Sequence, residues 1–524
     1  MTKTHSLKYV QTSCCPHASN RQKSFSGMTR RKFLQSVGGT ALVTATLTKL
    51  SWSTLPAVDL EGETALNRRP LKVKPILVYS IPKRQLQTSW RSWGGIQTQQ
   101  DANQEVSRIK NELSKLRAEA DFPVEFLPVA CVQGVGDLSA GNDLALGDVF
   151  LLYAAGGWMD VFSALAKFGR DMIFFCRHKS GPVYLWYEII SPRYLRQHTD
   201  KLAVEGADDS DVVVDSQEEI LWRLRSLCGL RNTIGTRVLA VGGPSAWSQP
   251  EGVVPKLVEE KFKFDIQTVS YDELAKLIKQ ARADRAAIES ARRRADTYLK
   301  STGCTLETER QFVDNAFLLE QIFRQLMKKA ECHSITINDC MSTIMPIAET
   351  SACLTLSLLN DAGYLAFCES DFVVIPSGVL LANISGKPVF LNDPTYPHDG
   401  VITLAHCTAP RKMDGKKLEP ARILTHFESD YGAAPKVEMP KGQTVTNIAP
   451  DFAFNRWVGL RGEIKDAPFM DICRSQIDIS FTCDSKTLAE RMPGFHWMTG
   501  YGDCCREIGY ALKRVGIQWE YLES

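Results

Sequence analysis

The stretch LKVKPILVYS, residues 71–80, is an apolar run whose composition predicts a buried strand. The segment after it, residues 99–120, carries its charges at helical spacing, as in NQEVSRIKNELSKLRAEA. Further strands are predicted at residues 123–132, 148–155, 171–176 and 182–190. Short apolar runs that alternate with amphipathic segments indicate an α/β unit with a mostly parallel sheet.

A second series of the same kind begins further along the chain. Residues 217–230 predict an amphipathic helix, and TRVLAV (236–241) predicts the next strand, with Gly242-Gly243 at its carboxyl end. Such ends are where open α/β sheets bind ligands. Residues 271–302 are strongly helical and charged.

The predicted secondary structure changes at about Gly386, where short extended runs separated by Gly, Pro and Asp replace the predicted helices. One helix, residues 503–515, closes this part. We therefore expect two Rossmann-like α/β domains followed by a β-rich, barrel-like domain. The expected boundaries are a leader at 1–57, an N-terminal α/β domain at 68–232, a central α/β domain at 233–384 and a β-rich C-terminal domain at 385–524.

Composition excludes several classes of protein. The 524 residues are 44% hydrophobic, which is typical of a globular protein rather than a disordered one. With 62 Lys and Arg against 60 Asp and Glu, nothing global attracts the chain to nucleic acid. No stretch approaches the roughly 18 uncharged apolar residues of a membrane span, so we expect no stable membrane insertion. The fifteen cysteines include no C-x-x-C spacing, and most are interpreted as small, reduced, buried hydrophobes.

The leader resembles a twin-arginine export signal. Thr29-Arg30-Arg31-Lys32-Phe33-Leu34 precedes a weakly apolar run, SVGGTALVTATL (36–47). The alternative is an ordinary basic N-terminus, since Arg-Arg pairs are common. The signal predicts export by the Tat machinery to a periplasmic or other extracytoplasmic location.

Common catalytic motifs are absent from the sequence. There is no G-x-x-x-x-G-K-[ST], no complete G-x-G-x-x-G, no G-x-S-x-G and no H-E-x-x-H. The stretch from Glu331 to His406 instead concentrates polar groups, with Glu369 and Asp393 near the ends of apolar runs and His406 in a β-type segment. His496 lies in a further β-type segment near the C-terminus. Carboxylates with one or two imidazoles suit a hard or borderline divalent ion. With 60 acidic residues and nine histidines, chance proximity in sequence is the alternative.

Five short pieces occur in the order seen in L-fucose isomerase-like proteins, the fucose/arabinose isomerase superfamily, and the chain resembles that family. The pieces are Cys368-Glu369-Ser370-Asp371, Gly386-Lys387-Pro388 through Asp393, Ala405-His406-Cys407, Thr425-His426-Phe427-Glu428, and His496-Trp497 with Gly502-Asp503. The similarity covers about residues 70–524 and is most specific in 331–505. The resemblance implies the three-domain plan, a monosaccharide substrate and a homo-oligomer.

The resemblance also implies an activity and a site. The activity is that of a metal-dependent intramolecular oxidoreductase, an aldose–ketose isomerase that works through an enediolate. The metal ligands are Glu369, Asp393, His496 and, less closely matched, His406, with Glu369 and Asp393 also catalytic. The ion is expected to be Mn²⁺, with Mg²⁺, Co²⁺ or Zn²⁺ as alternatives. A cation at that position polarises the substrate's carbonyl and hydroxyl oxygens while carboxylates move the proton.

Other interpretations remain open at this point. The export signal, and the lack of a match to the residues that would define a particular sugar, also fit an exported, non-catalytic carbohydrate-binding protein. An exported oxidoreductase is a third hypothesis. The absence of a complete dinucleotide-binding motif argues against it. Trp158, Trp247 and Trp497 could stack on a sugar, although a lone Trp is more often a core residue. His398 and His426 could support the ligands from behind or be ordinary surface histidines, and the second interpretation is favoured for both.

Overall fold

The computed structural model describes residues 64, 66–138, 143–156, 159–184, 207–247 and 249–522. The predicted leader (1–57), Trp158 and residues 185–190 of one predicted strand lie outside the described residues. The chain divides into two compact units. One, here the N-terminal unit, comprises residues 68–232 and 506–514; the other, here the main unit, is built chiefly from residues 233–505 and 515–524.

The N-terminal unit contains a parallel six-stranded sheet in the order β2-β1-β4-β5-β6, with β3 also paired to β1. Its strands are β1 (Leu71–Val78), β2 (Val124–Phe126), β3 (Ala130–Val132), β4 (Val149–Ala154), β5 (Asp171–Cys176) and β6 (Val212–Val214). Its helices are α2 (Gln99–Glu119), α3 (Met159–Ala166), α5 (Gln217–Thr233) and α14 (Cys505–Arg514). The single strand predicted at 123–132 is two short strands, with Pro128, which has no amide hydrogen for a ladder, lying between them.

A second parallel sheet, of four strands, lies in the main unit in the order β11-β10-β7-β8. Its strands are β7 (Arg237–Val241), β8 (Asp265–Val269), β10 (Ser334–Ile337) and β11 (Leu365–Phe367). The helices of this part are α6 (Val253–Phe262), α7 (Tyr271–Ala283), α8 (Arg285–Leu299), α9 (Arg310–Lys329), α10 (Met345–Ala348), α11 (Cys353–Asp361) and α12 (Ile375–Ser385), with a π-turn at Cys340–Ile344. The helix predicted at 271–302 breaks at Asp284, whose carboxylate accepts from the amides of Ala286 and Ala287 and so starts α8.

The carboxyl-terminal part of the main unit is an antiparallel barrel of six strands in the order β16-β19-β12-β13-β18-β17, closed by pairing of β16 with β17. The strands are β12 (Phe390–Pro394), β13 (Val401–His406), β16 (Thr444–Pro450), β17 (Arg456–Asp466), β18 (Ser475–Ser480) and β19 (Trp497–Tyr501). A seventh, β20 (Gln518–Tyr521), adds in parallel to β17, and α13 spans Ser485–Arg491. The predicted fold class, two parallel α/β sheets and a β-barrel, is therefore confirmed.

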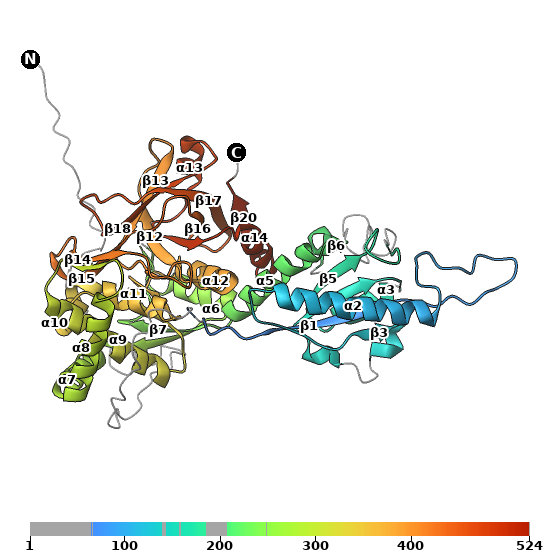
Figure 1. Cartoon of the computed structure of the whole chain (residues 1–524), viewed down its shortest axis with the longest axis horizontal. Helices are drawn as coiled ribbons and strands as arrows, with labels where there is room; N and C mark the ends of the chain where they lie inside the picture. The colour runs from blue at the N-terminus through green and yellow to red at the C-terminus, as the bar shows by residue number, and fades with distance from the viewer. Residues whose placement is uncertain are drawn as a thin grey trace, which may run out of the picture. The chain divides into compact units, whose positions relative to one another are not determined.

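Two further elements connect the sheet and the barrel of the main unit. Helix α12 contacts β11 of the parallel sheet as well as β16 and β19 of the barrel (Figure 1). A three-stranded sheet, β15-β14-β9, lies beside α9 and α11. Its strands are β9 (Cys304–Leu306), β14 (Ala421–His426) and β15 (Tyr431–Val437).

No single helix among the described residues is long and apolar enough to cross a membrane. One bent helix pair, Cys340–Ala348 with Cys353–Asp361, meets that test by length and composition only.

Candidate metal centre

Three barrel strands carry predicted ligands to the same place. Strand β12 lies between β13 and β19, and its register pairs Asn392 with Trp497 and Asp393 with Ala405. Extending each ladder by one residue puts His496 opposite Asp393 and places His406 beside it. The antiparallel register thus brings together Asp393, His406 and His496, although the first and last of them are more than a hundred residues apart in sequence.

The fourth predicted ligand comes from the parallel sheet. Glu369 lies two residues beyond the end of β11, at the carboxyl edge of the sheet, where ligands of open α/β proteins bind. Glu369 and Ser370 both have left-handed backbones, with φ of 64° and 47°. For residues other than glycine this conformation costs on the order of 1 kcal/mol or more, and such strain concentrates at functional sites.

These four side chains form one cluster. His496 Nε2 lies 3.3 Å from Glu369 Oε2 and 3.2 Å from Asp393 Oδ1, and His406 Nε2 lies 3.5 Å from Glu369 Oε1. Both histidines are buried, whereas the Glu369 and Asp393 side chains keep 11% and 15% of their surface exposed. The side chains of Glu369 and Asp393 are thus the most exposed members of the cluster, although both oxygens of Asp393 are buried.

Asp371 fixes the orientation of His496, a role the sequence did not reveal. Its Oδ2 lies 2.7 Å from His496 Nδ1, while Oδ1 accepts from the backbone amides of Val373 (3.1 Å) and Trp247 (3.3 Å). When the His496 ring is neutral, a carboxylate on Nδ1 favours the tautomer that leaves the Nε2 lone pair facing Glu369 and Asp393. The available signal was the spacing Glu369-Ser370-Asp371, which places a second acid beside the predicted ligand.

His406 is oriented in a similar way by a neutral group. Its Nδ1 lies 3.0 Å from the hydroxyl of Thr408, two residues further along the chain. Its Nε2 is thereby directed at Glu369. Both histidines thus present the same ring nitrogen to the carboxylates.

The electrostatics of the cluster favour a positive charge at its centre. Burial favours the neutral form of Glu369, but the imidazoles of His496 and His406 outweigh burial and lower the pKa of Glu369 to about 2. Burial is the largest influence on Asp393 and raises its pKa to about 6, against the attraction of the same imidazoles. Burial opposes charging of His496, but Asp393 and Glu369 raise the pKa of His496 well above its usual value. Protons on the imidazoles here supply the positive charge that a bound cation would otherwise provide.

The donor set fits a divalent cation. Both oxygens of Asp393 and Nε2 of His496 are buried and have no hydrogen-bond partner among the described residues. Asp393, His406 and His496 each offer an atom within 4.8 Å of the others, and Cys368, Glu369 and His406 do likewise. These buried His, Cys and acidic groups could hold a metal ion.

The remaining residues singled out from sequence lie in different surroundings. The Trp247 ring stacks on the Phe495 ring, with centroids 4.3 Å apart, and lies edge-on to the His496 ring, with centroids 6.0 Å apart. Trp247 and Phe495 therefore form an aromatic wall next to the cluster. Trp497 is a core residue in β19, and His398 is exposed in the β12–β13 turn. His426 is not a surface histidine as expected, because it is buried beside Cys353 and Cys407.

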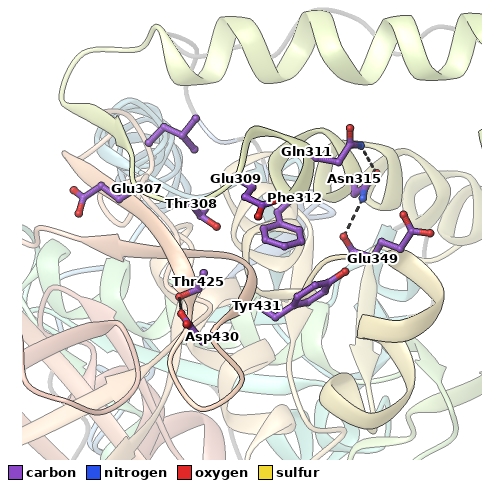
Figure 2. Close-up of a pocket in the computed structure, with 11 residues that line it drawn as sticks. Glu307, Thr308, Glu309, Gln311, Phe312, Asn315, Glu349, Thr425, Asp430 and Tyr431 are labelled. Carbon is purple, nitrogen blue, oxygen red and sulfur yellow. Dashed lines mark hydrogen bonds between the residues drawn. The ribbon is translucent and has the colours of Figure 1, made fainter.

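A pocket of about 840 Å³ lies elsewhere in the main unit (Figure 2). Phe312 and Tyr431 lie next to each other among the residues that line it (Figure 2). Their rings pack edge to face, with centroids 4.4 Å apart. Glu307, Glu309, Glu349 and Asp430 give its lining an acidic character. None of the four clustered ligands lines this pocket, so it is separate from the candidate centre.

Comparison of the chain with models of known protein families gives no match, and comparison with curated proteins gives none either.

Proposed function

We propose that the chain is a metal-dependent aldose–ketose isomerase whose site is the cluster of Glu369, Asp393, His406 and His496. The observation that carries the proposal is the convergence of Glu369, Asp393 and His496 from two different sheets, with His496 Nε2 3.3 Å from Glu369 Oε2 and 3.2 Å from Asp393 Oδ1. The resemblance of the surrounding motifs to the fucose/arabinose isomerase superfamily supports the same activity.

The expected ion is Mn²⁺, with Mg²⁺, Co²⁺ or Zn²⁺ as alternatives, because the donors are carboxylate oxygens and imidazole nitrogens. Glu369, Asp393, His496 and His406 would hold it. When bound, it supplies polarisation of two neighbouring oxygens of an open-chain sugar.

The chain's own residues account for the proton chemistry. Isomerisation removes a proton from the carbon beside the carbonyl and returns one to the former carbonyl carbon, while a hydroxyl proton passes between the two oxygens. Atoms are therefore conserved, and no external oxidant is needed. Glu369 and Asp393 lie on either side of His496 and provide two carboxylates, one to accept the proton and one to assist its return. The Trp247–Phe495 wall offers an apolar face against which a sugar could stack.

The test is a comparison of the wild type with Glu369→Gln. We expect the wild type, loaded with Mn²⁺, to exchange the C2 proton of an aldose with solvent deuterium, measured by NMR across a panel of monosaccharides. Glu369→Gln should lose both the bound ion and the exchange, because the amide removes one charged donor. The control is Glu490→Gln, which changes an exposed acid in α13 of the same unit.

Full activity in chelator-treated, metal-stripped protein would contradict the proposal. So would calorimetric binding of a sugar with no proton exchange for any member of the panel. That second result would support the exported, non-catalytic carbohydrate-binding protein instead.

A further inference from the structure

The main unit contains a second group of possible metal ligands, whose donors are two thiol sulfurs and an imidazole nitrogen in place of carboxylate oxygens. The thiols of Cys353 and Cys407 and a ring nitrogen of His426 all lie within 4.8 Å of one another. All three residues are buried, with 3%, 2% and 6% of their surface exposed. We call them the thiol cluster.

Two more thiols extend this cluster on either side. Cys340 is within hydrogen-bonding reach of Cys353, and Cys473 is within reach of Cys407. The sulfurs also accept backbone amides, from Arg474 to Cys407 at 3.4 Å and from Ala352 to Cys340 at 3.4 Å. A fourth sulfur donor is therefore available next to either cysteine of the cluster.

Three separate elements build the cluster. Cys353 is the first residue of α11. Cys407 directly follows β13, and His426 is the last residue of β14. Because successive side chains of extended backbone point to opposite sides, His406 can reach the carboxylate cluster while Cys407 reaches the thiols.

The histidine is the member that simple packing does not explain. Buried cysteines alone are common as small hydrophobes. His426, however, brings a polar ring into a site formed by Cys353, Ala405, Cys407, Ala434 and Cys473. Its Nδ1 lies 3.1 Å from the hydroxyl of Ser429, which leaves Nε2 for the thiols. A ligating histidine held by an oxygen at its other nitrogen is the usual arrangement in metal sites.

We propose that Cys353, Cys407 and His426 form a second metal site, for a thiophilic divalent cation of the Zn²⁺ class, completed by a thiol from Cys473 or Cys340. In a tetrahedral zinc site with Zn–S of about 2.3 Å, neighbouring sulfurs lie about 3.8 Å apart. That separation falls within the 4.8 Å that bounds the ligand atoms of Cys353, Cys407 and His426. The bound ion would join α11, β13 and β14 and so hold the strand that carries His406. This proposal does not depend on the isomerase activity.

The experiment measures zinc in the full-length protein purified without chelators. We expect one equivalent of zinc that survives dialysis, and Co²⁺ in its place to give sulfur-to-cobalt charge-transfer absorption. Cys407→Ser and His426→Gln should lose this ion and this absorption. Cys332→Ser is the matched control, because Cys332 is equally buried in the same unit but lies outside the cluster, and Glu369→Gln should also retain the ion.

A measurement on the wild type guards against variants that fail to fold. Titration with an organomercurial should release the zinc as thiols of the cluster react, detected with a chromogenic chelator. Wild-type protein that retains no zinc and shows no cobalt–sulfur absorption would overturn the proposal. Zinc that is lost in Glu369→Gln but kept in Cys407→Ser would also overturn it, since the ion would then belong to the carboxylate cluster.

Discussion

At the scale of single residues, Asp371 orients the His496 ring of the candidate centre without being one of its ligands. It is 2% exposed and bonds His496 across 125 positions of sequence. Its second oxygen is occupied by two backbone amides. The carboxylate therefore has no freedom to turn, and the His496 ring is held with it.

Asp371→Asn should weaken Mn²⁺ binding by about 10- to 100-fold. The amide lacks the negative charge that supports the Nδ1–H of His496, and its NH₂ group must face either that N–H or the amides of Val373 and Trp247. Calorimetric titration with Mn²⁺ measures the effect. Asp399→Asn, in the exposed β12–β13 turn, is the control; equal affinities in both variants would refute the role given to Asp371.

A second residue, Glu419, should make stability depend on pH. Burial raises its pKa to about 8, and it accepts a hydrogen bond from Tyr501 at 2.7 Å. The folded state therefore holds this proton more tightly than the unfolded state, in which the pKa is about 4.3. The stabilisation is fully present below pH 4 and is lost as the pH rises to 8, where ionising the buried group costs on the order of 4 kcal/mol.

Glu419→Gln removes that titration. We expect its thermal midpoint to match the wild type at pH 5 and to exceed it by several degrees at pH 9, as measured by scanning calorimetry. A wild type that stays the more stable of the two at pH 9 would show that Glu419 is not buried in neutral form.

The sequence was sufficient to nominate Glu369, Asp393, His406 and His496, because these residue types lie in motifs that resemble one family. It did not reveal the contact of Asp371 with His496 or the proximity of His426 to Cys353 and Cys407. Their roles depend on which elements meet in space, and Asp371 and His496 are 125 residues apart. His426 belongs to one of the five quoted motifs, but nothing local in the sequence marks the two thiols beside it.

At the scale of elements, helix α12 sets the distance between the strand before Glu369 and the strand after His496. Gly378 makes the close approach possible, because a Cβ there would lie 2.7 Å from the ring of Phe367 in β11 and would also meet Met498 in β19. Phe367 is buried and cannot move aside easily.

Gly378→Ala should therefore have two effects of opposite sign on the stability of the folded state. Helix propensity favours alanine by about 1 kcal/mol, whereas the clash with a packed core costs about 1–3 kcal/mol. We expect the clash to outweigh the helix propensity, so the variant should have a lower thermal midpoint and should bind Mn²⁺ more weakly than the wild type. Gly134→Ala, whose Cβ would meet nothing within 4 Å, is the control; an unchanged or raised midpoint in Gly378→Ala would contradict the close packing of α12.

Most elements could be predicted from apolar periodicity, since β1, β4, β5 and β7 are buried runs that end near their predicted limits. The differences come from single residues. Pro128 divides one predicted strand, and Asp284 caps a new helix inside a predicted continuous one. The pairing order of the barrel could not be predicted from apolar periodicity, because β19 pairs with β16 and with β12, which are distant from it in sequence.

At the scale of the whole molecule, the candidate centre and the thiol cluster both lie in the main unit. A ligand that binds only the folded state stabilises it by an amount set by its concentration relative to Kd, about 2.7 kcal/mol at a hundredfold excess. Metal should therefore stabilise the main unit and leave the N-terminal unit unaffected.

Scanning calorimetry of the full chain should show this selectivity. Adding Mn²⁺ to chelator-treated protein is expected to raise the transition of the main unit by several degrees and not that of the N-terminal unit. Hydrogen exchange followed by mass spectrometry assigns each transition to its residues. Equal shifts in both units, or none, would be inconsistent with a site confined to residues 369–496.

Anomalous diffraction from crystals grown with Mn²⁺ would show whether Glu369, Asp393 and His496 together hold one divalent cation. We expect a manganese peak between the two carboxylates and Nε2 of His496, within about 2.3 Å of each donor. A map with no peak there, or with manganese only beside Cys353 and Cys407, would contradict it.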